Sequence, residues 1–309
     1  QEVAYRAQLA EPRGRLHAAA ARALLELRGK RGGDVTWARI AEHHEAAGEK
    51  LEAARAWARA AAASEHVNPL RAFAQWERAL PLARESGNAK GAALALEVTL
   101  ALAGLASFVG LGVEKAEQLF REGDELARAR GDDRARALLL TRRGLFRFND
   151  AGDWRSLLEC ADEASRLAAA TGDHLLRVQM AVGAANAQFQ ASEFSRALSG
   201  FDEALALVEA KPDVAIPPAT LEMLYRFRGR DLYELGRLVE SRADLDRADR
   251  LGRECDSTQI GNFQSLLDAR LGNFRAALDL ARTQALAAER LGSPFRRIHA
   301  GPRWREGCA

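Results

Sequence analysis

Gly29, Gly32 and Gly33 lie beside Lys30, and these are the residue types that surround the phosphates of a nucleotide. A phosphate-binding loop has the spacing Gly-x-x-x-x-Gly-Lys-Ser/Thr, because backbone N–H groups must cradle the phosphates while the lysine reaches them. The spacing around Lys30 differs, and an arginine follows the lysine where a hydroxyl is needed. We therefore expect no nucleotide site and no cofactor in this chain.

The adjacent histidines His43 and His44 are the best candidates for a metal site. A zinc-binding helix carries its two histidines four residues apart on one face, whereas neighbouring residues point to different sides of the helix. One packed and one solvated histidine is the simpler interpretation, and we expect no metal. The cysteines, Cys160, Cys255 and Cys308, are odd in number and far apart. They predict neither a disulfide framework nor a metal site, and they favour a reducing cytoplasm.

Catalytic nucleophiles and paired carboxylates give no stronger signal. The Gly-x-Ser-x-Gly motif that exposes a nucleophilic serine does not occur. Carboxylates mostly alternate with arginines, as in the segment "RADLDRADR" of residues 242–250, which is typical of a solvated, ion-paired helix surface. We expect a protein that is not an enzyme. A helical hydrolase built on scattered carboxylates remains an alternative.

The charge balance limits the classes of partner. The 309 residues include 45 basic and 43 acidic side chains, with a net charge of +2. This balance argues against a dominant nucleic-acid or membrane surface, although a nucleic-acid-binding helical repeat is a less favoured alternative. We expect no apolar run long enough to span a bilayer, and the charged N-terminus has no signal-peptide core. Without an initiator Met, the sequence is expected to be a piece of a longer cytoplasmic protein.

A repeated pattern positions the remaining candidates. In residues 191–207, "ASEFSRALSGFDEALAL", Phe194 is followed by Ala197, Phe201 and Ala204 at steps of three, four and three. These steps place all four residues on one stripe of an α-helix. Degenerate copies follow other small polar turns. They begin at Leu51, Pro69, Val113, Trp154, Phe194, Leu238 and Phe274.

The spacing of the copies predicts the fold class. From Val113 onward the copies begin 41, 40, 44 and 36 residues apart, with a second apolar stretch in each interval. The repeating unit is therefore helix, short turn, helix, which predicts an all-α solenoid of about seven antiparallel hairpins. A small residue nine positions before each copy allows the two helices to cross closely, as at Gly104, Ala185, Gly229 and Ser265. The residue nine positions before Trp154 is the large Leu145, so the sequence does not predict where the two helices of that hairpin cross.

Composition divides the chain into three segments. Residues 1–34 are expected to form an N-terminal helix and linker, and residues 35–292 the repeat array. Residues 293–309 carry arginines without a helical stripe and are expected to be a disordered basic tail. Since no polar capping helix follows the last copy, its outer face is expected to be apolar, and self-association through it is predicted.

The motif in residues 191–205 resembles the second helix of a tetratricopeptide repeat. This resemblance implies a right-handed superhelix whose first helices line a groove that binds a peptide or protein. In that family the exposed groove positions lie twelve, eight and five residues before the start of the second helix. Carried over, they are Arg142, Phe146, Asn149, Val182, Asn186, Phe189, Arg226, Arg230 and Tyr233.

The chemistry of these positions suggests the partner. Arginine holds carboxylates bidentately, asparagine bonds a peptide backbone, and aromatic rings give contact area. We therefore expect an acidic protein or peptide as the ligand. The alternative is that some of these arginines pair with carboxylates of the next hairpin.

A second resemblance lies near the N-terminus. The segments "RLHAAAARALLEL" (15–27) and "IAEHHEAAGEKLEAARAWARAAAAS" (40–64) are similar to a junction in large bacterial signalling proteins. That junction follows the nucleotide-binding module of multidomain signal-transduction ATPases, class III adenylate cyclases, LuxR-type regulators and serine/threonine kinases. It implies that an ATPase or kinase module precedes Gln1 and that this chain is a partner-sensing arm. A free-standing adaptor is the alternative.

Overall fold

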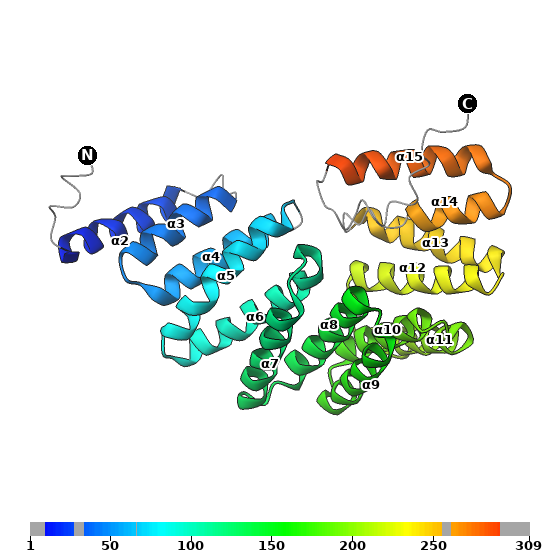
Figure 1. The fold of residues 1–309 in the computed structure, drawn as a ribbon, viewed down its shortest axis with the longest axis horizontal. Coiled ribbons are helices and arrows are strands. Elements are labelled where there is room, and N and C mark those ends of the chain that lie inside the picture. The colour runs from blue at the N-terminus through cyan, green and yellow to red at the C-terminus, as the bar shows by residue number, and fades with distance from the viewer. Residues whose placement is uncertain (1–9, 28–33, 66, 255–260, 291–309) are drawn as a thin grey trace. The chain divides into compact units, whose positions relative to one another are not determined.

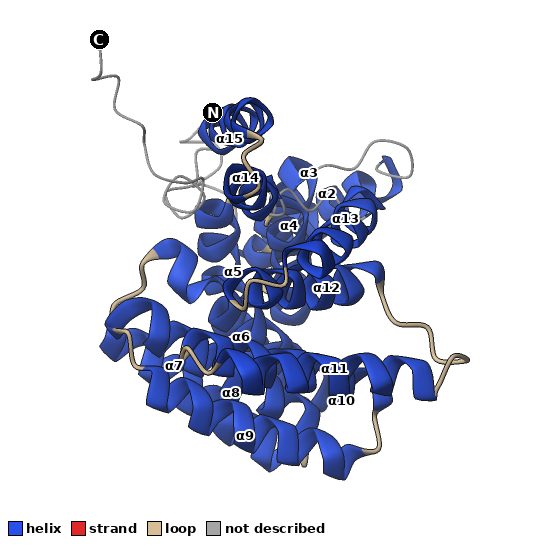
Figure 2. Ribbon diagram, turned by 90° about the vertical axis from the view of Figure 1, so that its right-hand side faces the viewer, coloured by secondary structure: helices blue, strands red, loops and turns tan. Residues whose placement is uncertain are grey.

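A computed structural model describes residues 10–27, 34–65, 67–254 and 261–290. The described part contains fourteen helices and no strand (Figures 1 and 2). The all-α prediction is therefore confirmed. The cysteines Cys255 and Cys308 and the predicted basic tail, residues 293–309, lie outside the described residues.

The chain divides into two compact units, residues 1–135 and 136–309. In the first unit the helices are α2 (Ala10–Leu27), α3 (Asp34–Ala46), α4 (Lys50–Ser64), α5 (Pro69–Glu85), α6 (Ala89–Val109) and α7 (Val113–Ala129). The second unit begins in the first turn of α8 (Asp133–Ala151). It continues through α9 (Trp154–Thr171), α10 (His174–Gln190), α11 (Phe194–Ala210), α12 (Pro218–Glu234), α13 (Leu238–Glu254), α14 (Gly261–Arg270) and α15 (Phe274–Arg290). The predicted array limits, 35 and 292, remain predictions.

Side-chain caps start several of these helices where the sequence has small polar turns. Asn68, Asn88, Asp153 and Asp173 each accept a hydrogen bond from the backbone N–H three residues ahead. Such a cap satisfies one of the N–H groups that the first helical turn leaves without a partner. The turns therefore fix the start of each helix locally, before any tertiary packing.

The core of the first unit consists of tryptophans packed among alanines. Trp37, Trp57 and Trp76 are buried with the alanine-rich faces of α3, α4 and α5 and with Val98 and Leu102 of α6. Small alanines allow helices to approach closely while the indoles supply apolar area. One expectation about the copies is wrong here: those at Leu51 and Pro69 begin the consecutive helices α4 and α5, not the second helices of two separate hairpins.

The prediction that no apolar stretch is long enough to cross a membrane is also wrong. Helix α6 has 21 residues, and its mean hydropathy reaches 2.0, so it passes that test by length and composition. Half of its apolar window is buried in the protein, because α6 packs against α5 and α7. A helix covered on several sides is apolar around most of its circumference, which explains this composition.

In the second unit each hairpin covers the apolar side of the next. Phe201 of α11 is completely buried between Val182 and Phe189 of α10 and Leu224 of α12. Phe201 therefore lies between its own hairpin and the following one, as the repeat predicts. Leu245 of α13 is equally buried and lies against Gly229 of α12. These contacts confirm a solenoid of successive helical pairs.

The crossing at Leu145, which the repeat left unpredicted, is achieved one residue earlier. A Cβ atom on Gly144 would lie 3.0 Å from Cys160 Cβ and 3.2 Å from Leu157 Cα, so Gly144 is the close approach. The backbone bond that closes the turn joins Asp153 N–H to the carbonyl six residues back, that of Arg147. In other turns of the unit this hydrogen bond reaches back only five residues: the N–H of Glu193, for example, donates to the carbonyl of Gln188. The extra residue in the turn shifts the register by one.

Candidate functional site

The first helices of the hairpins in the second unit, α8, α10, α12 and α14, lie next to one another in order. Thr141 of α8 contacts Met180 of α10, with 3.3 Å from Oγ1 to Sδ. The guanidinium of Arg230 on α12 lies 4.2 Å from the ring centre of Phe189 on α10 and 5.1 Å from that of Phe263 on α14. We call this row of four first helices the inner row. It contains all nine predicted groove residues.

The inner row does not expose all of them. On α8, Arg142 is half-buried and Asn149 is exposed, but Phe146 is buried. On α10, Val182, Asn186 and Phe189 are all buried. The expectation of exposure is wrong for these four residues and for Arg226 on α12. The reason is that neighbouring first helices contact each other directly, so positions that would line an open groove become part of the interior.

Asn186 has an unsatisfied polar atom within this interior. Its side chain is only 7% exposed, and its Oδ1 atom has no hydrogen-bond partner among the described residues. A buried acceptor without a partner costs free energy, so such atoms are few in folded proteins. Asn186 lies about one helical turn before Phe189 on α10.

Arg226 is part of a buried ion pair. Its Nε atom donates to Glu222 Oε1 at 2.7 Å, and both side chains are almost fully buried. Glu222 lies four residues earlier on the same helix. The alternative given above, that these arginines pair with carboxylates of the next hairpin, is therefore wrong for Arg226. Glutamate four residues before arginine is a known helix-stabilising spacing and was visible in the sequence. Arg226 is therefore already neutralised.

Arg230 is a partly buried cation of the inner row. It makes no ion pair with the described residues, and its guanidinium lies between the rings of Phe189 and Phe263. Burial lowers the pKa of Arg230, and Glu234 partly opposes that effect. A guanidinium that lies over aromatic rings keeps its N–H donors, which a carboxylate can accept bidentately.

Tyr233 continues the row toward α14. The guanidinium of Arg270 lies 4.7 Å from the centre of the Tyr233 ring, and its Nη1 atom donates to the Tyr233 carbonyl at 3.0 Å. Sequence reasoning missed Arg270 and Phe263, because neither falls at one of the three groove spacings. The sequence indicated these two residues only through their types, an aromatic residue and an arginine within the first helix of the next hairpin, and such residues are too common to predict a site.

The described residues offer little chemistry for catalysis or metal binding. They contain no group of three His, Cys, Asp or Glu side chains that could hold a metal ion. His44 is buried and bonded to Glu49 at 2.6 Å, whereas His43 is half-buried and contacts His17. Burial is the main cause that raises the pKa of the Cys160 thiol, which keeps it protonated and a weak nucleophile.

Two surface features lie apart from the inner row in sequence. In the first unit a shallow depression of about 320 Å³ is lined by residues of the α3–α4 and α5–α6 turns, including the ion pair of Lys50 and Glu85. On α15 the apolar side chains Phe274, Leu278 and Leu286 are exposed. Binding of a second copy to α15 stays a prediction.

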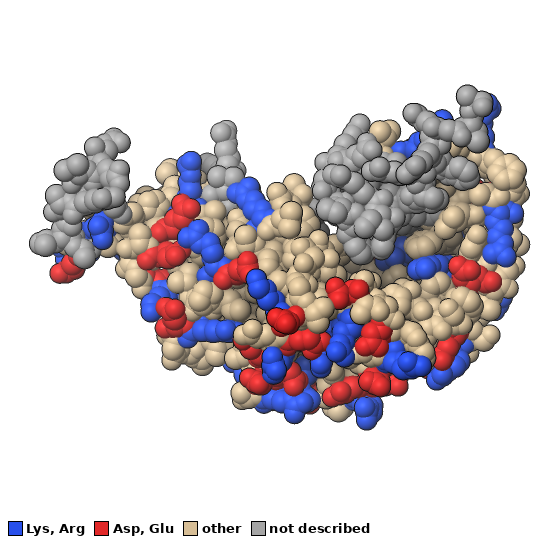
Figure 3. Space-filling model, in the orientation of Figure 1, with Lys and Arg blue, Asp and Glu red and all other residues tan. Residues whose placement is uncertain are grey.

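Charge on the described surface is mixed. Figure 3 shows Lys and Arg residues interspersed with Asp and Glu over the visible helices of both units. Many of these charges form local pairs, such as Arg128 with Asp124 and Arg196 with Glu193. Exposed pairs of this kind contribute little to stability and give no strong field for a polyanion.

This is the architecture of a helical-repeat protein, and comparison with solved structures identifies the kind of repeat. The chain is similar to a signal transduction ATPase with numerous domains from Pyrococcus horikoshii, which has a tetratricopeptide repeat sensor: the TM-score is 0.53 and the identity 13%. It is also similar to the apo form of RapI, with a TM-score of 0.61 and 12% identity. For a Rap protein complexed with competence and sporulation factor, the TM-score is 0.59 and the sequence identity 16%.

The coverage of these matches differs. The chain aligns over 94% of its length with the archaeal ATPase but spans about half, 48%, of that protein. The match to RapI includes 90% of this chain and 98% of RapI. The match to the complexed Rap protein includes 83% of this chain and 71% of that protein chain. No protein-family model and no curated protein matches the sequence. At these identities the likeness establishes the fold, which is a tetratricopeptide-like array of helix pairs, as the repeat motif predicted.

Proposed function

We propose that the chain is a non-catalytic protein-interaction domain of a bacterial, cytoplasmic protein, and that its inner row binds an acidic segment of a protein or peptide. The observation that carries this proposal is Arg230, a half-buried cation stacked between two aromatic rings without an ion pair among the described residues. Three consecutive first helices hold it in place, so little entropy is lost when a carboxylate binds.

Asn186 supports the same interpretation. Its unpaired Oδ1 atom can accept a backbone N–H of an extended ligand after a small movement of the side chain. Phe189 is buried against Phe194, with ring centres 5.4 Å apart, and against the Arg230 guanidinium, and it sets the position of that cation. In this proposal Arg226, Val182 and Phe146 shape the row from within and do not contact the ligand.

For the parent protein we propose a signalling chain in which this domain is the sensing arm behind an ATPase or kinase module. The archaeal ATPase, which is about twice as long and carries a tetratricopeptide sensor, favours this arrangement. A free-standing adaptor is the second candidate, because the chain covers 98% of RapI. Sequencing the genomic region upstream of Gln1 distinguishes them: a nucleotide-binding module in the same reading frame is expected, and its absence would favour the adaptor.

Binding is tested with Arg230→Gln and a matched control. Arg196→Gln removes the same charge from an exposed position on α11. Peptides from proteins captured by the wild-type chain are measured in two forms, with Asp and Glu present or replaced by Asn and Gln. We expect Arg230→Gln and the neutral peptides each to lose about tenfold or more in affinity, since a charged hydrogen bond contributes about 1.5–3 kcal/mol. Unchanged affinity for Arg230→Gln would rule out this site, and nucleotide turnover by the purified chain would contradict a non-catalytic role.

A further inference from the structure

Asp231 is an acid in the interior of the second unit whose carboxylate makes no hydrogen bond with the described residues. Its side chain is 0% exposed, and neither carboxylate oxygen has a hydrogen-bond partner among the described residues. Ionised carboxylates are almost never buried in this way, because desolvation disfavours the charged form. Asp231 follows Arg230 in sequence but lies on another face of α12, the face that carries Arg228.

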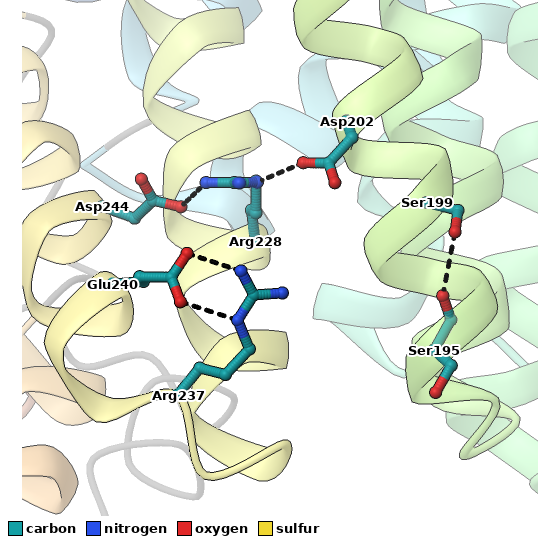
Figure 4. A network of polar contacts seen from close by, with 7 residues as sticks. All are labelled: Ser195, Ser199, Asp202, Arg228, Arg237, Glu240 and Asp244. Atoms are coloured by element: carbon teal, nitrogen blue, oxygen red, sulfur yellow. Dashed lines mark hydrogen bonds and ion pairs between the residues drawn. The ribbon is translucent and has the colours of Figure 1, made fainter.

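Arg228 joins two consecutive hairpins through α12. Its Nε atom donates to Asp202 of α11 at 2.8 Å, and its Nη1 atom donates to Asp244 of α13 at 2.6 Å (Figure 4). The guanidinium is therefore already shared by two carboxylates. Asp231 is a third acid in the same region, with the charges of Asp202 and Glu234 also acting on it. Arg247 also acts on Asp244, and Arg237 on Asp202, whereas neither carboxylate oxygen of Asp231 is hydrogen-bonded to the described residues.

We infer that Asp231 is a proton-binding site that keeps α12 packed against α11 and α13 while it is protonated, and that losing the proton loosens this joint between hairpins. A protonated carboxyl is neutral and tolerates burial, whereas the ionised form places an unpaired charge between the helices. The inference rests on the packing of the second unit and does not depend on the proposed ligand.

The electrostatics of the surrounding residues agree with this assignment. The pKa of Asp231 is raised to about 7: burial is the largest cause, Glu234 and Asp202 act in the same direction, and Arg228 opposes them. Burial also raises the pKa of Asp244, against the opposing effect of Arg228. Both carboxyls therefore favour the protonated state more strongly in the folded protein than in the unfolded chain.

The sign of the pH effect follows from proton linkage. In an unfolded chain an aspartate has a pKa near 3.9, so between about pH 4 and pH 7 the folded state holds a proton that the unfolded state has lost. Raising the pH through this window therefore destabilises the second unit, by up to about tenfold in the unfolding equilibrium constant for each pH unit. Below the window both states are protonated, and above it both are ionised, so the effect levels off.

The full chain is tested by hydrogen exchange of the α12 amides and by thermal unfolding at pH 5, 6, 7 and 8. Asp231→Asn and Asp231→Leu remove the titrating group in two ways, and Asp213→Asn changes an exposed aspartate in the loop before α12 as the control. In the wild type and the control, protection of α12 is expected to fall as the pH rises. The two Asp231 variants are expected to lose most of this dependence, and Glu234→Gln to move it to lower pH.

A direct titration makes the result independent of whether the variants fold. In the wild-type chain labelled with ¹³C-aspartate, the carboxyl resonance absent from Asp231→Asn is expected to titrate near pH 7. If the variants do not fold, the wild-type chain is expected to show one aspartate that titrates above pH 6. A wild-type chain in which every aspartate titrates near pH 4, or an Asp231→Leu variant with the wild-type pH profile, would overturn the inference.

Discussion

The two units bury different kinds of side chain. In the described part of the first unit the buried polar residues are uncharged or histidine: His44, Ser64, Gln75 and Thr99. In the second unit α12 and α13 bury four acidic or basic side chains, Glu222, Arg226, Asp231 and Asp244. The first unit keeps its arginines near the surface, where Arg59 and Arg78 lie over the rings of Trp37 and Trp57.

This difference separates structural from functional roles for the same helical motif. An interior of alanine and tryptophan is stabilised by apolar area and packing, which specify no ligand. Buried charges cost free energy on desolvation, and replacing a buried pair with apolar residues is often neutral or stabilising. The buried charges of α12 lie on the same helix as Arg230, in the unit where we propose the binding site and the proton-binding Asp231.

The largest effect is expected for the buried ion pair. Arg226→Met leaves Glu222 in the interior without its partner, which should lower the free energy of unfolding by about 3–5 kcal/mol. In the first unit, Arg78→Met removes an arginine whose side chain is half-exposed and paired with Glu45, and we expect a loss of about 0–1 kcal/mol. Urea denaturation followed by circular dichroism measures both.

A double variant distinguishes the cost of an unpaired charge from the cost of lost packing. Glu222→Leu combined with Arg226→Met removes both charges and should recover most of the stability that Arg226→Met loses. If the double variant were as unstable as the single one, shape and not charge would dominate this part of α12, and the contrast between the two units would lose its physical basis.

The fold was predictable because the pattern that encodes it is local. Ala197, Phe201 and Ala204 lie on one helical stripe, and each hairpin contacts mainly its neighbours, so the order of packing follows the order of the chain. The exceptions came from details of single turns and helices. The extra residue before Trp154 shifts its crossing to Gly144, and α6 is apolar around most of its surface because it is covered on several sides.

The candidate site was less predictable, because exposure depends on how closely neighbouring hairpins approach. The groove spacing placed Arg230, Tyr233 and Val182 on first helices, but it could not show that Val182 is buried whereas the other two are partly exposed. The Glu222–Arg226 pair had a signal in its four-residue spacing. Phe263 had only a nonspecific signal and Asp231 had none, since the position of one and the burial of the other arise from tertiary packing.

Glycines in tight contacts give the next largest effect in both units: Gly91 lies at the α5–α6 turn and Gly229 at the α12–α13 crossing. In Gly91→Ala the new Cβ atom would lie 2.4 Å from the backbone carbonyl oxygen of Ala83, whereas in Gly229→Ala it would lie 3.0 Å from Leu245 Cγ. We expect losses of about 3 kcal/mol for the first and about 1–2 kcal/mol for the second, because a side chain yields more easily than backbone.

Gly183→Ala is the control for this pair. Its Cβ atom would meet nothing nearer than 3.8 Å, so it should stabilise α10 by about 0.5–1 kcal/mol through helix propensity. Thermal unfolding of the three variants gives the ranking. If Gly183→Ala were as destabilising as Gly229→Ala, the crossings would not be specified by close contacts at particular glycines.

The smallest effect is expected at the helix caps, where the two units should behave alike. Asn68 caps α5 in the first unit and Asp153 caps α9 in the second, each accepting a backbone N–H at 3.0 Å. Replacement of either by alanine should cost about 1 kcal/mol, and replacement by serine much less, because serine retains the acceptor. Circular dichroism during urea denaturation measures these losses. Since the cap is a local interaction, a cost at Asp153 several times that at Asn68 would mean that the second unit is sensitive throughout, and the difference between the units could no longer be assigned to the buried charges of α12 and α13.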